Sequence, residues 1–171
     1  LRRGTHRTMD PAATLANLKP LMPAVGITRV ANLTGLDVTG VPVVAVCRPN
    51  SRSNIVAQGK GLDLDAAKVS GVIEAIEGYY AERIMQPVIF ASASEMGERY
   101  ALADLDGLPR RRTTGFNTDT RILWTASRDV CSDQEAWLPY EMVHANFSLP
   151  HPPGAGNFPC STNGLAAGNS S

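Results

Sequence analysis

Clustered hydrophobic positions near the N-terminus predict a short helix followed by a β-hairpin. Residues 27–33 and 41–48 are rich in β-branched side chains and are separated by Thr-Gly-Leu-Asp-Val-Thr-Gly, a turn-forming sequence. We therefore expect two antiparallel strands, with Pro42 at a strand start or a sheet edge. Upstream, Pro11 directly follows Asp10. This pair suits the start of a helix, which we expect to run through Leu18.

The longest apolar segment predicts the principal helix, over residues 63–83. Residues 50–58, which precede it, are expected to form a loop with a possible short strand. One side of this helix carries branched and aromatic residues (Val69, Val72, Ile73, Ile76, Tyr79 and Tyr80). The other side carries small residues (Ala67, Gly71, Ala75 and Gly78). Small residues let another backbone approach closely, although a glycine within a helix costs about 1 kcal/mol relative to alanine. We therefore expect the helix to pack on both flanks.

The rest of the chain alternates between strand-like and helix-like segments. The expected elements are a strand at 88–91, a helix at 94–103 capped by Ser92 or Ser94, a loop at 107–119, and strands at 121–127 and 135–143 around a turn at 131–133. Residues 148–171, rich in Pro, Gly, Asn and Ser, form either an ordered loop or the lead-in to a further segment. This alternation indicates an α/β or α+β fold. The length of 171 residues fits a single domain or one lobe of a larger one.

Charge and hydropathy exclude two broad function classes. Lys+Arg and Asp+Glu balance at 16 each, which argues against a general nucleic-acid binder, because such proteins rely on an excess of basic contacts to phosphate. The basic run at residues 110–112 is most simply a solvated loop. No stretch approaches the roughly 18 apolar residues that a membrane-spanning helix needs.

The cysteines and the N-terminal segment favour a reducing cytoplasm. Cys47, Cys131 and Cys160 are far apart and odd in number, and no zinc-binding spacing is present. We therefore expect them to be small packing residues. The segment LRRGTHRTMD lacks the apolar core of a signal peptide.

Histidine and tryptophan residues indicate packing rather than chemistry. His6, His144 and His151 each stand apart from other candidate ligands in the sequence. A packed or exposed histidine is therefore the simpler interpretation. Trp124 and Trp137 lie in the two late predicted strands, where a core or sheet-edge position is expected.

The principal helix carries a polar stripe that needs an explanation. Ser70, Glu74 and Glu77 fall within an arc of roughly 60° at about 100° per residue. Two carboxylates on a stripe between two packed flanks of a helix repel each other, so they require open solvent, arginine partners or a divalent cation. Mg²⁺ prefers one or two carboxylates together with phosphate oxygens. The helix alone leaves these alternatives open, with a solvated charged face the commonest of them.

A glycine turn before this helix adds a second hint of anion binding. Gln58-Gly59-Lys60-Gly61 places flexible backbone N–H groups and a lysine near a predicted helix N-terminus, where anions are favoured. The sequence is not a Walker A loop, and a lysine in a surface turn is the commoner arrangement.

Four segments occur together in a distinctive order. They are GITRVANLTGLDVTGVPV, GKG, the helix motif S-x-x-x-E-x-x-E and STNGLAAGN. Together they resemble the YcaO family, whose members are ATP-dependent enzymes that activate peptide amides. The resemblance covers essentially the whole chain and implies an α+β fold with a YcaO-like nucleotide-binding core, antiparallel hairpins and helices.

The resemblance also implies roles for individual residues. Ser70, Glu74 and Glu77 match the family's nucleotide-site helix, in which the carboxylates hold magnesium against the phosphates. Arg7 and Thr14, in THRTMDPAAT, resemble a basic–hydroxyl pair that contacts nucleotide, with Arg in place of the more usual Lys. Lys60 and the turn amides would then meet phosphate. The implied cofactors are ATP and Mg²⁺.

Two departures from the family pattern qualify the resemblance. Gly78 stands where many members have an arginine, and EAIEGYYAE resembles the branch associated with TfuA-type partner proteins. In addition, STNGLAAGN normally leads into a second acidic helix that completes the metal site. The resemblance therefore predicts that roughly the C-terminal half of the family's domain lies outside this chain.

Three functional readings follow. In the first, the chain is one lobe of an enzyme that phosphorylates a peptide amide oxygen, giving an azoline or a thioamide; some relatives are described as accessory factors for ribosomal-protein methylthiolation. In the second, it is a truncated, non-catalytic module that binds a peptide or a partner protein and could pair as a homodimer. The third, a hydrolase with Glu74 and Glu77 as acid and base, is weaker, because two residues one turn apart cannot easily act on opposite faces of a substrate.

Overall fold

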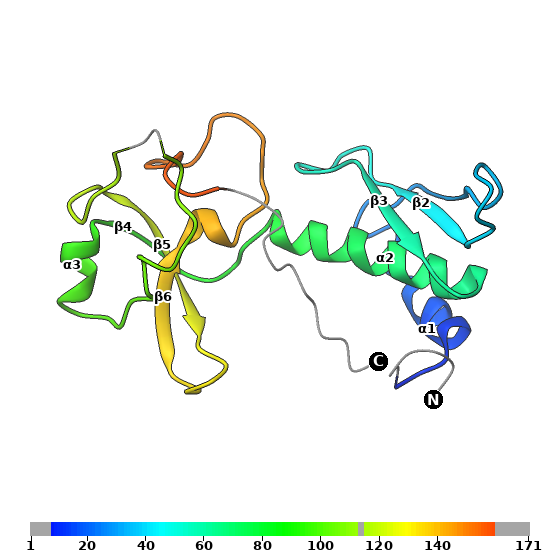
Figure 1. Ribbon diagram of the computed structural model, residues 1–171, viewed down its shortest axis with the longest axis horizontal. Helices are drawn as coiled ribbons and strands as arrows, with labels where there is room; N and C mark the ends of the chain where they lie inside the picture. The colour runs from blue at the N-terminus through cyan, green and yellow to red at the C-terminus, as the bar shows by residue number, and fades with distance from the viewer. Residues whose placement is uncertain (1–7, 113–114, 160–171) are drawn as a thin grey trace. The chain divides into compact units, whose positions relative to one another are not determined.

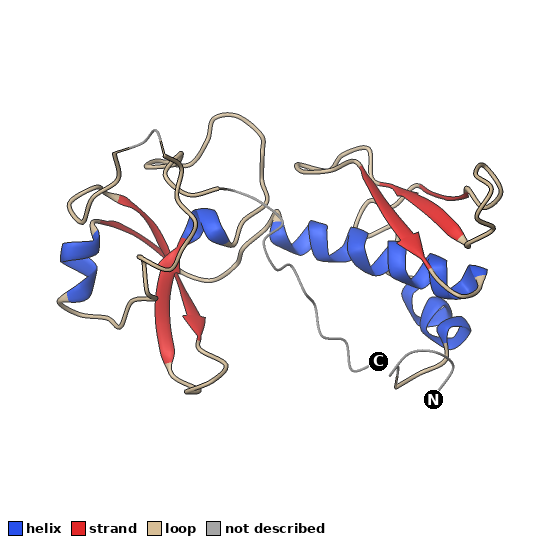
Figure 2. Cartoon of the chain, in the orientation of Figure 1, coloured by secondary structure: helices blue, strands red, loops and turns tan. Residues whose placement is uncertain are grey.

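The computed structural model describes residues 8–112 and 115–159, and these divide into two compact units. Unit 1 contains the described residues up to Glu82, and unit 2 contains those from Arg83 onward. Each unit has an antiparallel three-stranded sheet and helices (Figures 1 and 2). The mixed α+β class predicted from the sequence is therefore confirmed. The expectation of a single domain or lobe stays a prediction.

Unit 1 combines two helices with its sheet. Its elements are α1 (Pro11–Leu18), β1 (Arg29–Asn32), β2 (Val43–Cys47), β3 (Val56–Lys60) and α2 (Leu64–Ala81). The strand order is β1-β2-β3, with both pairs antiparallel. The predicted hairpin is confirmed, and Val30 pairs with Val46 in it. Asp10 caps α1, because its side chain accepts a hydrogen bond from the Ala12 amide.

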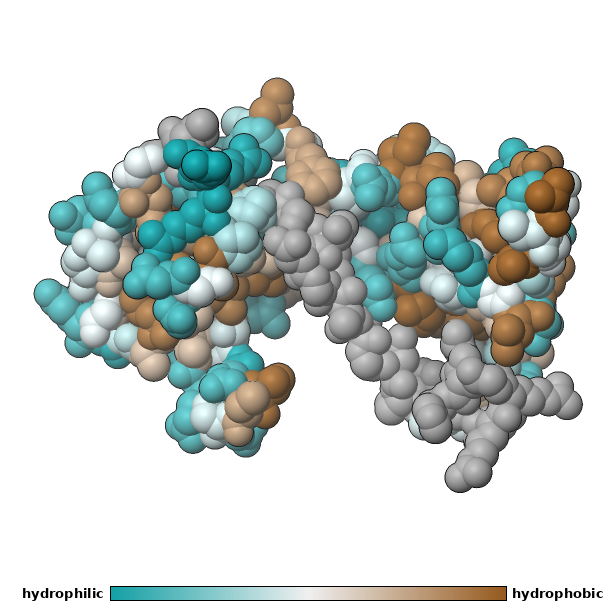
Figure 3. Space-filling view, in the orientation of Figure 1, coloured by the Kyte–Doolittle hydropathy of each residue, from teal (hydrophilic) through white to brown (hydrophobic). Residues whose placement is uncertain are grey.

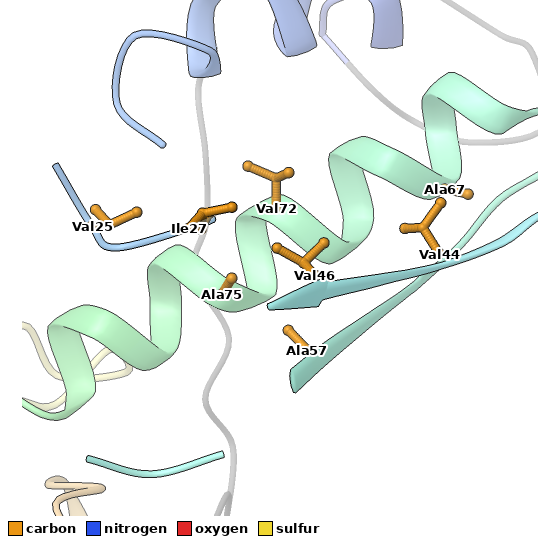
Figure 4. Close-up of a cluster of buried hydrophobic side chains, with 8 residues drawn as sticks. All are labelled: Val25, Ile27, Val44, Val46, Ala57, Ala67, Val72 and Ala75. Atoms are coloured by element: carbon orange, nitrogen blue, oxygen red, sulfur yellow. The ribbon is translucent and has the colours of Figure 1, made fainter. Parts of the chain in front are cut away.

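The core of unit 1 lies between its sheet and α2. Alternate residues of the central strand β2, Val44 and Val46, are fully buried and point towards the helix (Figure 4). The buried cluster comprises Val25, Ile27, Val44, Val46, Ala57, Ala67, Val72 and Ala75. One face of the sheet thus supplies valines and the helix supplies mainly small residues, which brings the two backbones close together.

Most of the glycine turn expected at residues 58–61 is instead the end of the third strand, which extends to Lys60. Gly59 and Lys60 belong to β3 and pair with Val44 and Val43. A Cβ on Gly59 would lie 2.0 Å from the carbonyl oxygen of Ala67. Glycine is required there because β3 runs directly against α2, so its role is packing rather than flexibility. Close approach on the small-residue side of the helix is confirmed.

Unit 2 contains the second sheet, of order β4-β5-β6. Its elements are β4 (Val88–Ala91), α3 (Ala93–Gly97), β5 (Ile122–Arg128), β6 (Glu135–Pro139) and a 3-10 turn, η1 (Tyr140–Met142). Trp124 and Trp137 are both buried in its core, as predicted. His144 is also packed, as expected, and its ring stacks on the Tyr140 ring with 4.5 Å between the ring centroids. Burial lowers the pKa of His144, because charging it would cost desolvation energy.

Two elements of unit 2 are shorter than predicted. The helix is capped by Ser92, but it ends at Gly97 instead of residue 103. Downstream, the Ala103 amide donates to the Trp137 carbonyl and the Trp137 amide donates to Ala101. This pairing with β6 overrides helix propensity. Strand β6 stops at Pro139 and gives way to η1, where the sequence predicted strand to residue 143.

The first part of the Pro/Gly-rich segment is an ordered loop that packs on unit 2. Phe158 is fully buried in the core. The carboxylate of Glu141 accepts hydrogen bonds from the backbone amides of Gly156, Asn157 and Phe158. These bonds hold residues 156–158 against η1. Residues 160–171, which include STNGLAAGN and Cys160, lie outside the described part of the chain.

The surface of both units mixes polar and apolar residues. Hydrophilic and hydrophobic side chains are interspersed over the face shown in Figure 3. Cys131 is exposed and Cys47 is half-buried, so the expectation that the cysteines are packing residues is wrong for Cys131. It lies in the β5–β6 turn, outside any hydrophobic cluster. None of the helices in the described part of the chain has the length and hydropathy of a transmembrane segment.

Candidate functional site

The polar stripe predicted on the principal helix is accessible in the structure. Ser70 and Glu77 are half-buried and Glu74 is exposed. All three belong to α2 and lie within the roughly 60° arc that helical spacing requires. The structure therefore brings these three residues together along one side of a single helix.

The packing of α2 explains why this side is left accessible. On one flank, the small residues Ala67 and Gly71 contact β3. On another flank, Val72, Ile76 and Tyr79 face the apolar cluster of unit 1. Tyr80, expected on the apolar face, is 63% exposed. The carboxylates thus border the packed faces without being enclosed by them.

One arginine close to α2 pairs with an acid outside the stripe. Arg48, which follows β2, is buried and pairs with Glu82 at 3.0 Å. Burial alone raises the pKa of Glu82, but hydrogen bonds from Ser51, Ser53 and Arg48 outweigh it and lower the pKa to about 2. The exposed Glu74 forms no ion pair with a basic side chain of the described residues. Arginine partners and solvent were alternatives for the two acids, and for Glu74 the structure favours solvent or a cation.

The donor set on α2 fits magnesium better than a metal held entirely by protein. Among the described residues, no group of three or more His, Cys, Asp or Glu side chains is arranged to hold a metal ion. Glu74 and Glu77 provide two hard carboxylate ligands, and Ser70 adds a hydroxyl one turn before Glu74. Mg²⁺ commonly takes one or two carboxylates and completes its shell with waters and phosphate oxygens. The residues present therefore fit a metal that arrives with a phosphate ligand.

Thr14 lies on the helix that packs against α2. Helix α1 contacts α2 directly (Figure 1), and Thr14 is its buried residue. Its hydroxyl donates to the carbonyl of Asp10 at 3.2 Å. Among the described residues, no donor bonds to this hydroxyl oxygen, which can accept a hydrogen bond as well as donate one. Arg7, the other residue of the expected pair, lies outside the described residues.

Lys60 is placed apart from the stripe. Burial alternates along β3, with Ala57 and Gly59 buried against α2 and Gln58 and Lys60 exposed. Successive strand side chains point to opposite faces, so Lys60 projects from the sheet face opposite α2. The N-terminus of α2 is already capped by Asp63, which accepts from the Ala66 amide at 2.7 Å. The structure therefore does not gather Lys60 with Ser70, Glu74 and Glu77.

Sequence analysis missed the polar network at the C-terminal end of α2. Arg48 donates to the carbonyls of Val25 and Ala75 as well as to Glu82. Ser51 and Ser53 donate to the same carboxylate, at 2.6 and 2.7 Å. The available signals were an arginine directly after a valine-rich strand and a glutamate at a helix end. Neither signal identifies a partner 34 positions away.

Comparison with known proteins identifies the family. The family model described as a YcaO cyclodehydratase, ATP- and Mg²⁺-binding, matches residues 58–171. The chain belongs to the YcaO family. The matched region contains the whole of α2 and hence Ser70, Glu74 and Glu77. The family resemblance inferred from the sequence is confirmed.

Curated relatives of this YcaO chain are considerably longer than it is. One is an uncharacterized protein in the tfuA 3' region of Rhizobium leguminosarum bv. trifolii, 37% identical over 95% of this chain and 38% of the relative. Another, from Mycobacterium tuberculosis, is 33% identical over 98% of this chain and 38% of its own length. The chain thus spans less than two-fifths of these relatives.

Solved YcaO-type structures have the same fold. The structure of YcaO from Methanopyrus kandleri bound with AMPPCP and Mg²⁺ superposes with a TM-score of 0.66 at 21% identity, covering 92% of this chain and 37% of that one. A heterocyclase in complex with substrate and cofactor superposes with a TM-score of 0.62 at 19% identity, covering 88% of this chain and 24% of the heterocyclase. At these identities the likeness supports the fold.

Proposed function

We propose that unit 1 of this YcaO chain contributes one side of an Mg²⁺·ATP site used to activate a peptide backbone amide. The observation that carries the proposal is the accessible stripe of Ser70, Glu74 and Glu77 on α2, within the region matched by an ATP- and Mg²⁺-binding family. Two carboxylates and a hydroxyl on one helix side match what Mg²⁺ bound to phosphate requires.

In this proposal each site residue has a defined task. Glu74 and Glu77 hold the magnesium ion, and Ser70 contacts the nucleotide from the preceding turn. Thr14 contacts the nucleotide from α1, together with Arg7. Lys60, on the far face of the sheet, reaches a phosphate only if its long side chain extends around the edge strand β3, so we rank it last among the six.

The chemistry is phosphoryl transfer, in which positioning and charge neutralisation account for most of the catalysis. When bound, Mg²⁺·ATP supplies the phosphoryl group that turns the amide oxygen into a leaving group, so that a Cys, Ser or Thr side chain gives an azoline and an external sulfide gives a thioamide. The residues of α2 bind and orient that group.

The biological setting that we propose is inferred from the curated relatives described above. A relative encoded in a tfuA region favours a TfuA-type partner and thioamide formation over azoline formation. Peptide modification in the cytoplasm is the setting we propose, and an accessory role in ribosomal-protein methylthiolation belongs to the same proposal. Because the chain spans less than two-fifths of the two relatives described above, a non-catalytic module that binds a peptide or a partner protein is the second candidate. Such a module could pair as a homodimer.

Calorimetric titration with Mg²⁺·ATP tests the proposal. We expect binding by the 171-residue chain that is lost in the E74Q/E77Q double variant. The matched control E98Q/E135Q removes two exposed glutamates of unit 2 and should bind as the unmodified protein does. Equal binding by E74Q/E77Q would overturn the metal assignment. Folded protein that binds no nucleotide would favour the second candidate.

A further inference from the structure

The guanidinium of Arg48 lies against α2, over the Tyr79 ring and beside positions 75, 78 and 82. Its Nη1 donates to the Ala75 carbonyl at 3.1 Å, and its Nη1 and Nη2 reach the Glu82 carboxylate at 3.3 and 3.0 Å. Between these two points, a Cβ on Gly78 would lie 3.3 Å from Nη1. Positions 75, 78 and 82 share one helix face. A single side chain therefore touches two consecutive turns of the helix.

Arg48 is also bonded to residues that flank the strands of the sheet. Its backbone amide donates to the Ile55 carbonyl at 2.8 Å, and its Nε donates to the Val25 carbonyl at 3.0 Å. The Glu82 carboxylate is fixed in turn by the hydroxyls of Ser51 and Ser53 in the β2–β3 loop. Arg48, which directly follows β2, thus links the end of that strand to the helix.

The two acids of the candidate site directly precede two of the contacted positions. Glu74 precedes Ala75, and Glu77 precedes Gly78. Each acid therefore lies about 100° around the helix from the position beside Arg48 that follows it. Any roll of α2 away from Arg48 carries both carboxylates with it. A roll of about 20° would shift a side chain at the helix surface by roughly 2 Å, given a helix diameter of about 10 Å. Mg²⁺ demands near-ideal geometry with metal–oxygen distances of about 2.1 Å.

We infer that Arg48 is a positioning residue that sets the roll of α2 and thereby the direction in which Ser70, Glu74 and Glu77 face. The inference rests on the proposed function, because it concerns the orientation of the same site. Replacing both members of a buried ion pair by uncharged groups of similar size often costs little stability, so the orientation of α2 and the affinity, and not stability, report the role of Arg48. A lysine cannot replace Arg48, because one ammonium group lacks the planar fork that reaches three separate acceptors.

Two measurements on the 171-residue chain test this inference. Residual dipolar couplings of the α2 amides, fitted together with those of β2 and β3, report the roll of the helix relative to the sheet. Calorimetry reports Mg²⁺·ATP affinity. The variants are R48K and R48M/E82Q, the second of which removes both buried charges while leaving an oxygen that accepts from Ser51 and Ser53. The control R128M/D133N removes an exposed arginine–aspartate pair of unit 2.

We expect the α2 couplings of R48M/E82Q to depart from the unmodified orientation and the affinity to fall about 10- to 100-fold, the usual effect of losing a group that orients metal ligands. R48K should show the same changes, and the control should show neither. Where R48M/E82Q does not fold, R48K alone gives both readouts.

Each contrary outcome has a distinct meaning. Unchanged α2 couplings would overturn the role of Arg48 in setting the roll. Changed couplings with unchanged affinity would overturn its role in positioning the acids. If the unmodified chain binds no Mg²⁺·ATP, the proposed function fails, and the couplings still decide whether Arg48 sets the roll.

Discussion

Gly59 of β3 lies so close to Gly71 of α2 that neither residue has room for a side chain. A Cβ on Gly59 would lie 2.3 Å from the Gly71 nitrogen, and a Cβ on Gly71 would lie 3.1 Å from the Gly59 nitrogen. Backbone atoms cannot move aside as a flexible side chain can. This contact sets the separation between the edge strand and the helix that carries the candidate site.

We therefore expect Gly59→Ala to destabilise the fold by about 3 kcal/mol, the upper range for overpacking a close contact. Urea unfolding followed by circular dichroism measures the change. Gly97→Ala is the matched control, because a Cβ there meets nothing within 4 Å. Its effect should stay within about 1 kcal/mol. Similar values for the two variants would contradict the close approach of β3 and α2.

The same contact shows where sequence patterns predicted the fold and where they did not. The valine-rich runs predicted the β1–β2 hairpin, because alternation and a turn sequence are local signals. For the end of β3 the sequence predicts a glycine turn instead, since Gln-Gly-Lys is typical of a loop when the facing helix is not considered. Gly59 is needed because the backbones of β3 and α2 lie in contact there, and that contact exists only in the folded protein. The overlong prediction for α3 failed for a related reason, namely the backbone pairing of residues 101–103 with Trp137.

The residues in and around the candidate site also divide into those that local spacing predicts and those that only the folded structure shows. Ser70, Glu74 and Glu77 share one helix, so their spacing alone predicted their common side. Arg48 and Glu82 are brought together only by folding, and no local pattern marked them. Lys60 was assigned to phosphate from its glycine neighbours, and that argument depended on a turn that the structure replaces with strand.

The Glu82 carboxylate makes stability depend on pH. Its pKa is lowered from 4.5 to about 2 in the folded protein, so folding favours the charged form. The resulting stabilisation is present above the unfolded pKa and is lost as pH falls from about 5 to about 2. A shift of this size corresponds to about 3 kcal/mol.

Glu82→Gln removes that titration. We expect the variant to be less stable than the unmodified protein at pH 7, and the difference in the free energy of unfolding to narrow as pH approaches 3. Urea titrations at several pH values measure it. Glu98→Gln, which alters an exposed glutamate, should leave the pH profile unchanged. A difference that stays constant across this range would show that Glu82 is not held ionised by Ser51, Ser53 and Arg48.

The buried hydroxyl of Thr125 gives a stabilising prediction in unit 2. Thr125 is 2% exposed, and its Oγ1 has no hydrogen-bond partner among the residues described. An unsatisfied buried hydroxyl costs free energy, so Thr125→Val should raise the free energy of unfolding by about 1 kcal/mol. Thermal unfolding measures the shift. Ser127→Ala in the same strand is the contrast, because its hydroxyl donates to the Ala136 carbonyl at 2.5 Å, and it should be destabilising. A less stable Thr125→Val would mean that the hydroxyl has a partner.

Substitutions at Thr14 can distinguish a structural role of its hydroxyl from a role in nucleotide binding. Among the described residues, its hydroxyl makes one long hydrogen bond, to the carbonyl of the N-cap residue Asp10 at 3.2 Å. Thr14→Val should therefore change the free energy of unfolding by less than about 1 kcal/mol, because the Asp10 carbonyl also accepts from the Thr14 amide. If the hydroxyl contacts the nucleotide, Mg²⁺·ATP affinity should fall about tenfold, the effect of losing one hydrogen bond to a charged ligand.

Thr14→Ser provides the matched control, since it keeps the hydroxyl and removes only a methyl group. Calorimetry on the three proteins should place Thr14→Ser with the unmodified chain and Thr14→Val apart from both. If both variants bind alike while unfolding remains unchanged, Thr14 is a packing residue of α1. The nucleotide contacts in unit 1 would then come from Arg7 and the stripe on α2.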